Sequence, residues 1–223
     1  MPDAQDHSTD TDNDTDPHAH AGPPGLTPLP SKEEMLLLEP FGRIGLEKIH
    51  VVSTRQAAQQ AMTELEGLRV LGFDTESKPT FLKGEVSDGP HVVQFATSGR
   101  AWVFQLHDPA CREAVAGLLA STHVTKVGFG LAGDRTQIMA KFGVPPEAVM
   151  DLDNAFRKMG YRKSVGVKTA IALIFNKRFL KSKKVATTNW ANARLTELQV
   201  LYAANDAWAA IRVYEALRLA DAP

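Results

Sequence analysis

Short apolar segments recur between residues 49 and 129, and their length limits this part of the chain to β-strands rather than long helices. The expected strands are Ile49–Val52, Val70–Phe73, Val92–Thr97, Ala101–Leu106 and Val124–Phe129. Ser98-Gly99-Arg100 is a turn suited to a hairpin, so three antiparallel strands are expected around it.

Helical segments alternate with some of these strands and predominate after them. Apolar residues recur at helical spacing in Ser53–Leu65, and helices are also expected at Ala110–Ala120 and Asp134–Phe142. This order favours the α/β class, with a mixed sheet flanked by helices. A chain of 223 residues with 43% hydrophobic content can bury one sizeable core, so a single folded domain is expected.

The first 31 residues differ from the rest in composition. They carry six Asp, no Lys, Arg or Glu, and almost nothing to bury, so we expect residues 1–31 to be a disordered acidic tail. Residues 32–223 then form the folded domain, with 25 basic side chains against 20 acidic ones. This excess of five positive charges suits a polyanionic partner but does not require one.

Neither cysteine chemistry nor a membrane span is indicated. Cys111 is the single cysteine, so one chain can form no internal disulfide and no cysteine-based metal site. No apolar run approaches the ~20 residues of a membrane helix, and the acidic N-terminus does not resemble a signal peptide. We expect a cytoplasmic protein without a membrane partner.

Asp74 and Glu76 follow the apolar segment Val70–Phe73 with a spacing of two. Alternation along an extended chain directs both carboxylates to the same face, where their charges repel. A divalent cation such as Mg²⁺ or Mn²⁺ removes this repulsion, because hard cations prefer carboxylate ligands. The alternative is a polar strand end that simply faces solvent.

A second pair of polar residues lies on the helix expected near the C-terminus. Thr196 and Gln199 match a capping box, and the apolar pattern continues to about Leu217. Tyr202 and Asp206 are four residues apart and therefore share one face of this helix. Alternatively, Tyr202 packs in the core and Asp206 faces solvent.

Asp134 follows a glycine-rich strand end, where it is either a helix N-cap or a metal ligand. The same glycines, Gly128-x-Gly130-x-x-Gly133, also match a dinucleotide-binding fingerprint, with Asp151 and Asp153 about 20 residues further on. An oxidoreductase is nevertheless disfavoured, because the Asp134 carboxylate would occupy the helix end that should bind a pyrophosphate.

Three motifs resemble, in order and separation, those of the DEDDy 3′→5′ exonucleases, the family of ribonuclease D and the Werner-syndrome exonuclease. They are Asp74-x-Glu76, the glycine-rich strand end before Asp134, and Tyr202-x-x-x-Asp206. The resemblance extends through the lysine-rich segment Lys181–Trp190 and covers about residues 46–218. It implies a ribonuclease H-like fold and the hydrolytic removal of single nucleotides from a 3′ end.

The resemblance also implies roles for the motif residues. Asp74, Glu76, Asp134 and Asp206 would hold two divalent cations, Mg²⁺ or Mn²⁺. Asp74 would bridge both ions, Asp134 would hold the second ion through water, and Tyr202 would orient the attacking water. All four carboxylates are present, which argues against an inactive nucleic-acid-binding module.

The implied substrate is single-stranded nucleic acid or a 3′ overhang, and the chain has basic residues to contact it. Ten basic residues and no acidic one lie between Arg157 and Lys184. The candidates for nucleic-acid binding are Lys168, Lys181, Lys183 and Lys184. Some relatives have aromatic residues where Ser77 and Arg135-Thr136 stand here, so the resemblance does not extend to how the substrate is gripped. DNA and RNA are not distinguished by any residue pattern.

Overall fold

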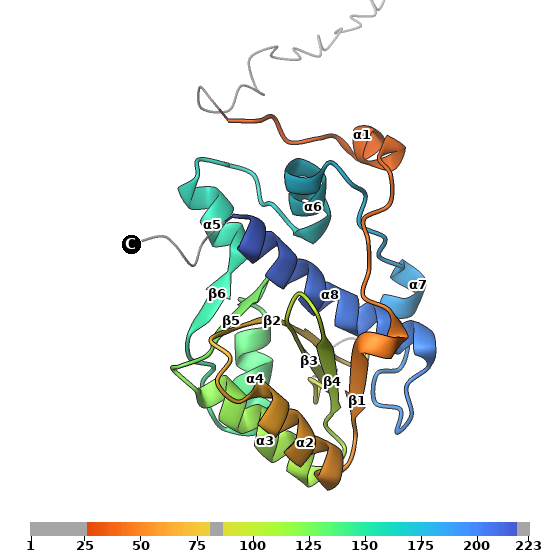
Figure 1. Ribbon diagram of the computed structural model, residues 1–223, viewed down its shortest axis with the longest axis vertical. Helices are drawn as coiled ribbons and strands as arrows, with labels where there is room; N and C mark the ends of the chain where they lie inside the picture. The colour runs from red at the N-terminus through yellow and green to blue at the C-terminus, as the bar shows by residue number, and fades with distance from the viewer. Residues whose placement is uncertain (1–25, 81–86, 218–223) are drawn as a thin grey trace, which may run out of the picture.

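A six-stranded mixed sheet forms the centre of the molecule in the computed structural model, which describes residues 26–80 and 87–217 (Figure 1). The strands are β1 (Ile49–Val52), β2 (Val70–Glu76), β3 (Val92–Ala96), β4 (Ala101–Gln105), β5 (Thr125–Gly128) and β6 (Val149–Asp151). Their order is β1-β4-β3-β2-β5-β6. The β2-β3 and β3-β4 pairs are antiparallel and the other pairs are parallel, which confirms the predicted mixed sheet.

Helices cover both faces of this sheet. They are α1 (Lys32–Leu37), α2 (Arg55–Leu65), α3 (Pro109–Ala120), α4 (Asp134–Phe142), α5 (Leu152–Lys158), α6 (Val167–Phe175), α7 (Lys183–Ala186) and α8 (Glu197–Ala216), with a 3₁₀ turn η1 (Leu46–Lys48). Helix α8 lies across one face, with α5 and α6 beyond it, while α2 and α3 lie on the opposite side (Figure 1). In the described ranges, no helix is both long and apolar enough to cross a membrane.

Alternation along β3 explains why the sheet has a core on each side. Val92 and Ala96 belong to the core beneath α8, whereas Val93 and Phe95 belong to the core beneath α2 and α3. All four side chains are fully buried. Such a strand must lie inside the sheet, because both of its faces exclude water.

Two strands differ from the sequence-based expectation. Strand β2 continues three residues beyond Phe73, so Asp74 and Glu76 lie within the strand, opposite Gln94 and Val92 of β3, rather than after it. Strand β6 was not predicted, because its three residues are too few to show a period.

The start of the domain also differs from expectation. Residues 26–31 were assigned to the disordered tail, but Leu26 and Leu29 pack against the core beneath α8. The hydroxyl of Tyr161 donates a hydrogen bond to the carbonyl oxygen of Thr27 at 3.1 Å, and Ser31 caps α1. For these six residues the prediction was wrong, because the two leucines provide apolar surface that can be buried. The remainder of the expected tail lies outside the described residues.

Candidate metal centre

Three carboxylates from β2 and α8 meet at one point. Asp74, Glu76 and Asp206 each offer an oxygen, and these oxygens all lie within 4.8 Å of one another. Among the residues that the structure describes, no other group of three acidic, histidine or cysteine side chains has the spacing of a metal site. We refer to these three residues as the carboxylate cluster. The motifs that the sequence analysis singled out on a strand and on a distant helix are therefore brought together.

The approach of α8 to β2 depends on a glycine. A Cβ on Gly72 would overlap the backbone oxygen of Ala207, so no larger residue fits at this crossing. Asp206 is the neighbour of Ala207, and Asp74 is two residues from Gly72. The close crossing therefore sets the separation between the carboxylates of the two elements.

Burial and mutual repulsion change the acidity of the cluster. Burial, with the charges of Asp74 and Asp206, raises the pKa of Glu76 to about 9. Burial also raises the pKa of Asp206 to about 7, and it raises the pKa of Asp74 above the ordinary aspartate value. Concentrated negative charge with little access to water creates a strong demand for a cation.

Asp134 lies beside this cluster at the start of α4. Gly133 is the N-cap residue of α4, so Asp134 is the first helical residue and not the cap. Its pKa is raised to about 6 by burial and by the charge of Asp74, while a hydrogen bond from the Thr75 side chain acts in the opposite direction. Asp134 therefore adjoins Asp74 without joining the closest set of three carboxylates.

The glycine-rich loop before Asp134 is held by a residue whose role the sequence analysis did not identify. The Asp151 carboxylate accepts hydrogen bonds from the backbone amides of Gly130 at 3.2 Å and Leu131 at 2.9 Å. It also caps α5 by accepting from the amide of Asp153 at 3.0 Å. The amides that a dinucleotide phosphate would need are thus already bonded within the protein, which contradicts the dinucleotide-binding alternative.

Tyr202 stands between the cluster and the aromatic core. Its ring centroid lies 5.9 Å from that of Trp190, which is 1% exposed and donates from Nε1 to the carbonyl oxygen of Ala186. Burial and the charge of Asp206 raise the pKa of Tyr202 above its ordinary value. Tyr202 therefore carries a neutral phenol beside the carboxylates, and Trp190 packs behind it.

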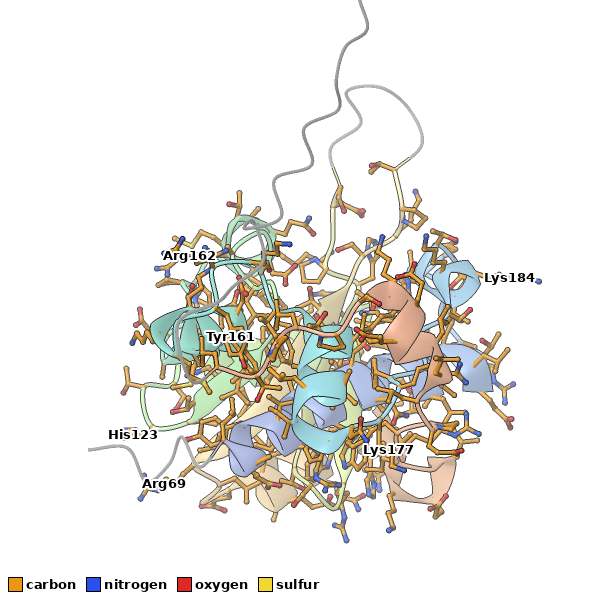
Figure 2. The ribbon with its side chains drawn as sticks, turned by 90° about the horizontal axis from the view of Figure 1, so that it is seen from above. Arg69, His123, Tyr161, Arg162, Lys177 and Lys184 are labelled. Carbon is orange, nitrogen blue, oxygen red and sulfur yellow. The ribbon has the colours of Figure 1, made fainter. Side chains whose placement is uncertain are left out.

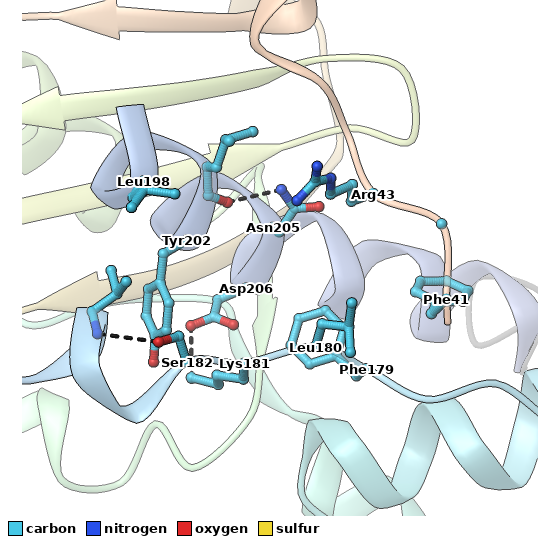
Figure 3. A pocket seen from close by; sticks show the side chains of 13 residues that line it. Phe41, Arg43, Phe179, Leu180, Lys181, Ser182, Leu198, Tyr202, Asn205 and Asp206 are labelled. Atoms are coloured by element: carbon cyan, nitrogen blue, oxygen red, sulfur yellow. Dashed lines mark hydrogen bonds and ion pairs between the residues drawn. The ribbon is translucent and has the colours of Figure 1, made fainter. Parts of the chain in front are cut away.

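Lys181 lies inside the site rather than on the surrounding surface. Its Nζ is 2.6 Å from Oδ2 of Asp206 and 5.2 Å from the ring centroid of Tyr202 (Figure 3). Burial lowers the pKa of Lys181, but the charges of Asp206 and Asp74 raise it more, so the amine is protonated. Of the four lysines considered for nucleic-acid binding, this one contacts a candidate metal ligand.

The other three candidate lysines are exposed. Lys168 is on α6 and close enough to lower the pKa of Asp206, while Lys183 and Lys184 are on α7. The basic stretch as a whole is spread over the surface, since Arg162 and Lys184 lie toward opposite edges in Figure 2. Only part of it is near the carboxylate cluster.

A cavity of about 370 Å³ opens next to the cluster (Figure 3). Tyr202, Asp206 and Lys181 line one side of it, and Phe41, Arg43 and Leu198 are among the other lining residues. Leu198 is 66% exposed at the start of α8. The cavity is therefore lined by the catalytic candidates on one side and by apolar and basic side chains elsewhere.

Comparisons with known proteins agree with this geometry. The family model described as "3'-5' exonuclease" matches residues 49–220. The chain is 30% identical over 154 residues to a 3'-5' exonuclease of Arabidopsis thaliana, covering 68% of this chain and 54% of that protein. It is 29% identical over 150 residues to the Mus musculus bifunctional 3'-5' exonuclease/ATP-dependent helicase WRN, covering 66% of this chain and 11% of that protein.

A solved structure shows the same fold. Trypanosoma brucei RNase D in complex with RNA U12 superposes with a TM-score of 0.66 at 22% identity, covering 82% of this chain and 64% of that one. The chain spans about half the length of the plant relative and about a tenth of the mouse relative. With the family model matching most of its length, the chain belongs to the 3'-5' exonuclease family.

Proposed function

We propose that this chain hydrolyses single-stranded nucleic acid or a 3′ overhang from the 3′ end, with two divalent cations, Mg²⁺ or Mn²⁺, as cofactors. The observation that carries the proposal is the cluster of Asp74, Glu76 and Asp206 beside the phenol of Tyr202. Family membership sets the class of reaction, and the cluster indicates the residues that perform it.

The chemistry of the donor set fits hard divalent cations. All ligand atoms of the cluster are carboxylate oxygens, and the nearby Lys181 supplies one positive charge against three acids. Asp74, Glu76 and Asp206 would hold one cation, and Asp134, adjoining Asp74, would help to hold the other. When bound, the cations acidify a water and stabilise the charge on the phosphoryl oxygens.

The residues of the chain position the reactants. Tyr202, neutral at physiological pH, can hydrogen-bond to the attacking water and direct it at phosphorus. Its ring is held against Trp190, so the hydroxyl has little freedom to move. The new bond joins the water oxygen to phosphorus and the bond from phosphorus to the 3′ oxygen breaks. The products are a nucleoside 5′-monophosphate and a shortened strand with a new 3′-hydroxyl.

Exposed lysines on α6 and α7 would hold the rest of the strand. Lys168, Lys183 and Lys184 can contact phosphates without regard to base sequence, as a single strand requires. The similarity to an RNase D that binds RNA supports a nucleic-acid substrate. These contacts would weaken with added salt.

The test is a degradation assay on the purified protein. Single-stranded DNA, RNA and a duplex with a 3′ overhang, each labelled at the 5′ end, are incubated with Mn²⁺ or Mg²⁺ and then with chelator. We expect a ladder of products one nucleotide apart that disappears with chelator. Binding without a ladder under all of these conditions would favour an inactive nucleic-acid-binding module.

A further inference from the structure

The ammonium group of Lys181 lies in contact with the carboxylate cluster. It lies 2.6 Å from Asp206 Oδ2, and the Asp206 side chain is buried at 4% exposure while that of Lys181 is partly buried at 30%. Among the ion pairs of residues 26–80 and 87–217, this is the one that involves a member of the carboxylate cluster. Lys181 is thus the positive charge in direct contact with the carboxylate cluster.

We propose that Lys181 is an internal counter-cation of the carboxylate cluster, and that a divalent cation must displace its ammonium group from Asp206 in order to bind. The inference rests on the metal site of the proposed function. It assigns Lys181 a role in metal affinity, distinct from the phosphate contact expected for the neighbouring lysines.

Competition follows from the shared oxygen. The Lys181 ammonium group already contacts the Asp206 carboxylate, and a divalent cation bound by the same carboxylate would repel it at such short range. Because Lys181 belongs to the same chain, its competition does not depend on protein concentration. Each metal ion that binds must break the ion pair between Lys181 and Asp206. Metal affinity is lowered by the free energy of that pair.

The backbone around Lys181 is anchored, so the side chain is the part that must move. Upstream, the amide of Arg178 donates to the Glu39 carbonyl at 2.8 Å, and the amide of Phe41 donates to the Arg178 carbonyl at 2.9 Å. Downstream, Ser182 caps α7. The cavity that Lys181 lines gives its long side chain space to swing away from Asp206 (Figure 3).

The inference is tested by titrating the full chain with Mn²⁺ in a calorimeter, without nucleic acid. Lys181→Met keeps most of the length of the unbranched side chain and removes its charge. We expect Lys181→Met to bind Mn²⁺ roughly tenfold more tightly than wild type, within the usual range of coupling between two ligands. Lys158→Met, at an exposed lysine on α5, should bind as wild type does.

A melting experiment gives an independent readout. Without metal, Lys181→Met should melt below wild type, because the cluster has lost its compensating charge. Saturating Mn²⁺ should raise its melting temperature by more than it raises that of wild type. Lys181→Gln, checked for folding by circular dichroism, replaces the methionine variant if that variant does not fold.

The outcomes separate this inference from the proposed function. Equal or weaker Mn²⁺ binding by folded Lys181→Met would overturn the counter-cation role while leaving the exonuclease proposal in place. Absence of Mn²⁺ binding in wild type and variant alike would overturn the proposed function itself, and the counter-cation role with it.

Discussion

Gly72 of β2 lies directly against the backbone oxygen of Ala207 in α8, and only a hydrogen atom fits between the strand and the helix at this point. The contact joins the two elements that carry the carboxylates. Gly72→Ala should therefore push α8 away from β2 and separate Asp206 from Asp74. We expect a loss of about 1–3 kcal/mol in the free energy of unfolding, together with weaker metal binding.

Denaturant unfolding and Mn²⁺ titration of Gly72→Ala test this expectation. The matched control is Gly117→Ala in α3, where an added Cβ meets nothing within 4 Å and alanine favours the helix. If Gly72→Ala binds Mn²⁺ as wild type does, the close crossing does not set the geometry of the cluster.

Asp74→Asn should reduce metal-dependent degradation by roughly 100-fold or more, comparable with the loss of a transition-state contact. The amide keeps the shape of the carboxylate but removes a ligand charge and relieves repulsion with Glu76. The metal-free variant should accordingly be at least as stable as wild type. Labelled-strand degradation and melting temperature measure the two effects. Glu113→Gln, an exposed carboxylate on α3, is the control and should change neither.

Tyr202→Phe removes the phenol oxygen and keeps the ring against Trp190. Turnover should fall by roughly 10- to 1000-fold, the range for losing one positioned catalytic group. KM should change little, since the hydroxyl is proposed to contact water rather than the strand. Steady-state kinetics with saturating Mn²⁺ measure kcat and KM of the variant. A wild-type kcat would show that Tyr202 only packs in the core and does not position the water.

Metal binding should depend on pH through Glu76 and Asp206, whose pKa values are raised to about 9 and about 7. Because the carboxyl pKa values are raised in the fold, the contribution of these two groups to stability is fully present at low pH and is lost as pH rises toward 9. Metal binding requires the charged forms, so the rise in melting temperature caused by Mg²⁺ should be larger at pH 8.5 than at pH 6. Differential scanning fluorimetry with and without Mg²⁺ at pH 6 and pH 8.5 measures this rise. Equal shifts would contradict the raised pKa values.

The segment before α1 should contribute to stability. Replacing Leu26 and Leu29 with alanine removes apolar contacts with the core beneath α8 and should cost about 1 kcal/mol or more in the free energy of unfolding. The same change at Leu36 and Leu37, which are 64% and 87% exposed, should have almost no effect. Urea denaturation of the two double variants compares them, and equal midpoints would show that the segment adds no stability.

Several features of the protein follow from local sequence patterns alone. The apolar segment Val92–Thr97 predicts a strand, and the capping box at Thr196 and Gln199 predicts the start of α8. The spacings of Asp74 with Glu76 and of Tyr202 with Asp206 place each pair on one face of its element. These features were predictable because the periods of strands and helices depend on neighbouring residues.

Other features depended on which distant segments pack together. No local pattern distinguishes Lys181 from Lys183, yet backbone pairing of Arg178 with Glu39 and Phe41 anchors the segment from which only Lys181 reaches Asp206. Asp151 likewise holds amides 20 and 21 residues away. Local periodicity determines the direction in which a side chain points, but tertiary packing determines what it meets. The sequence by itself therefore identified the carboxylates. Only the folded structure decided that the Lys181 ammonium group contacts one of them.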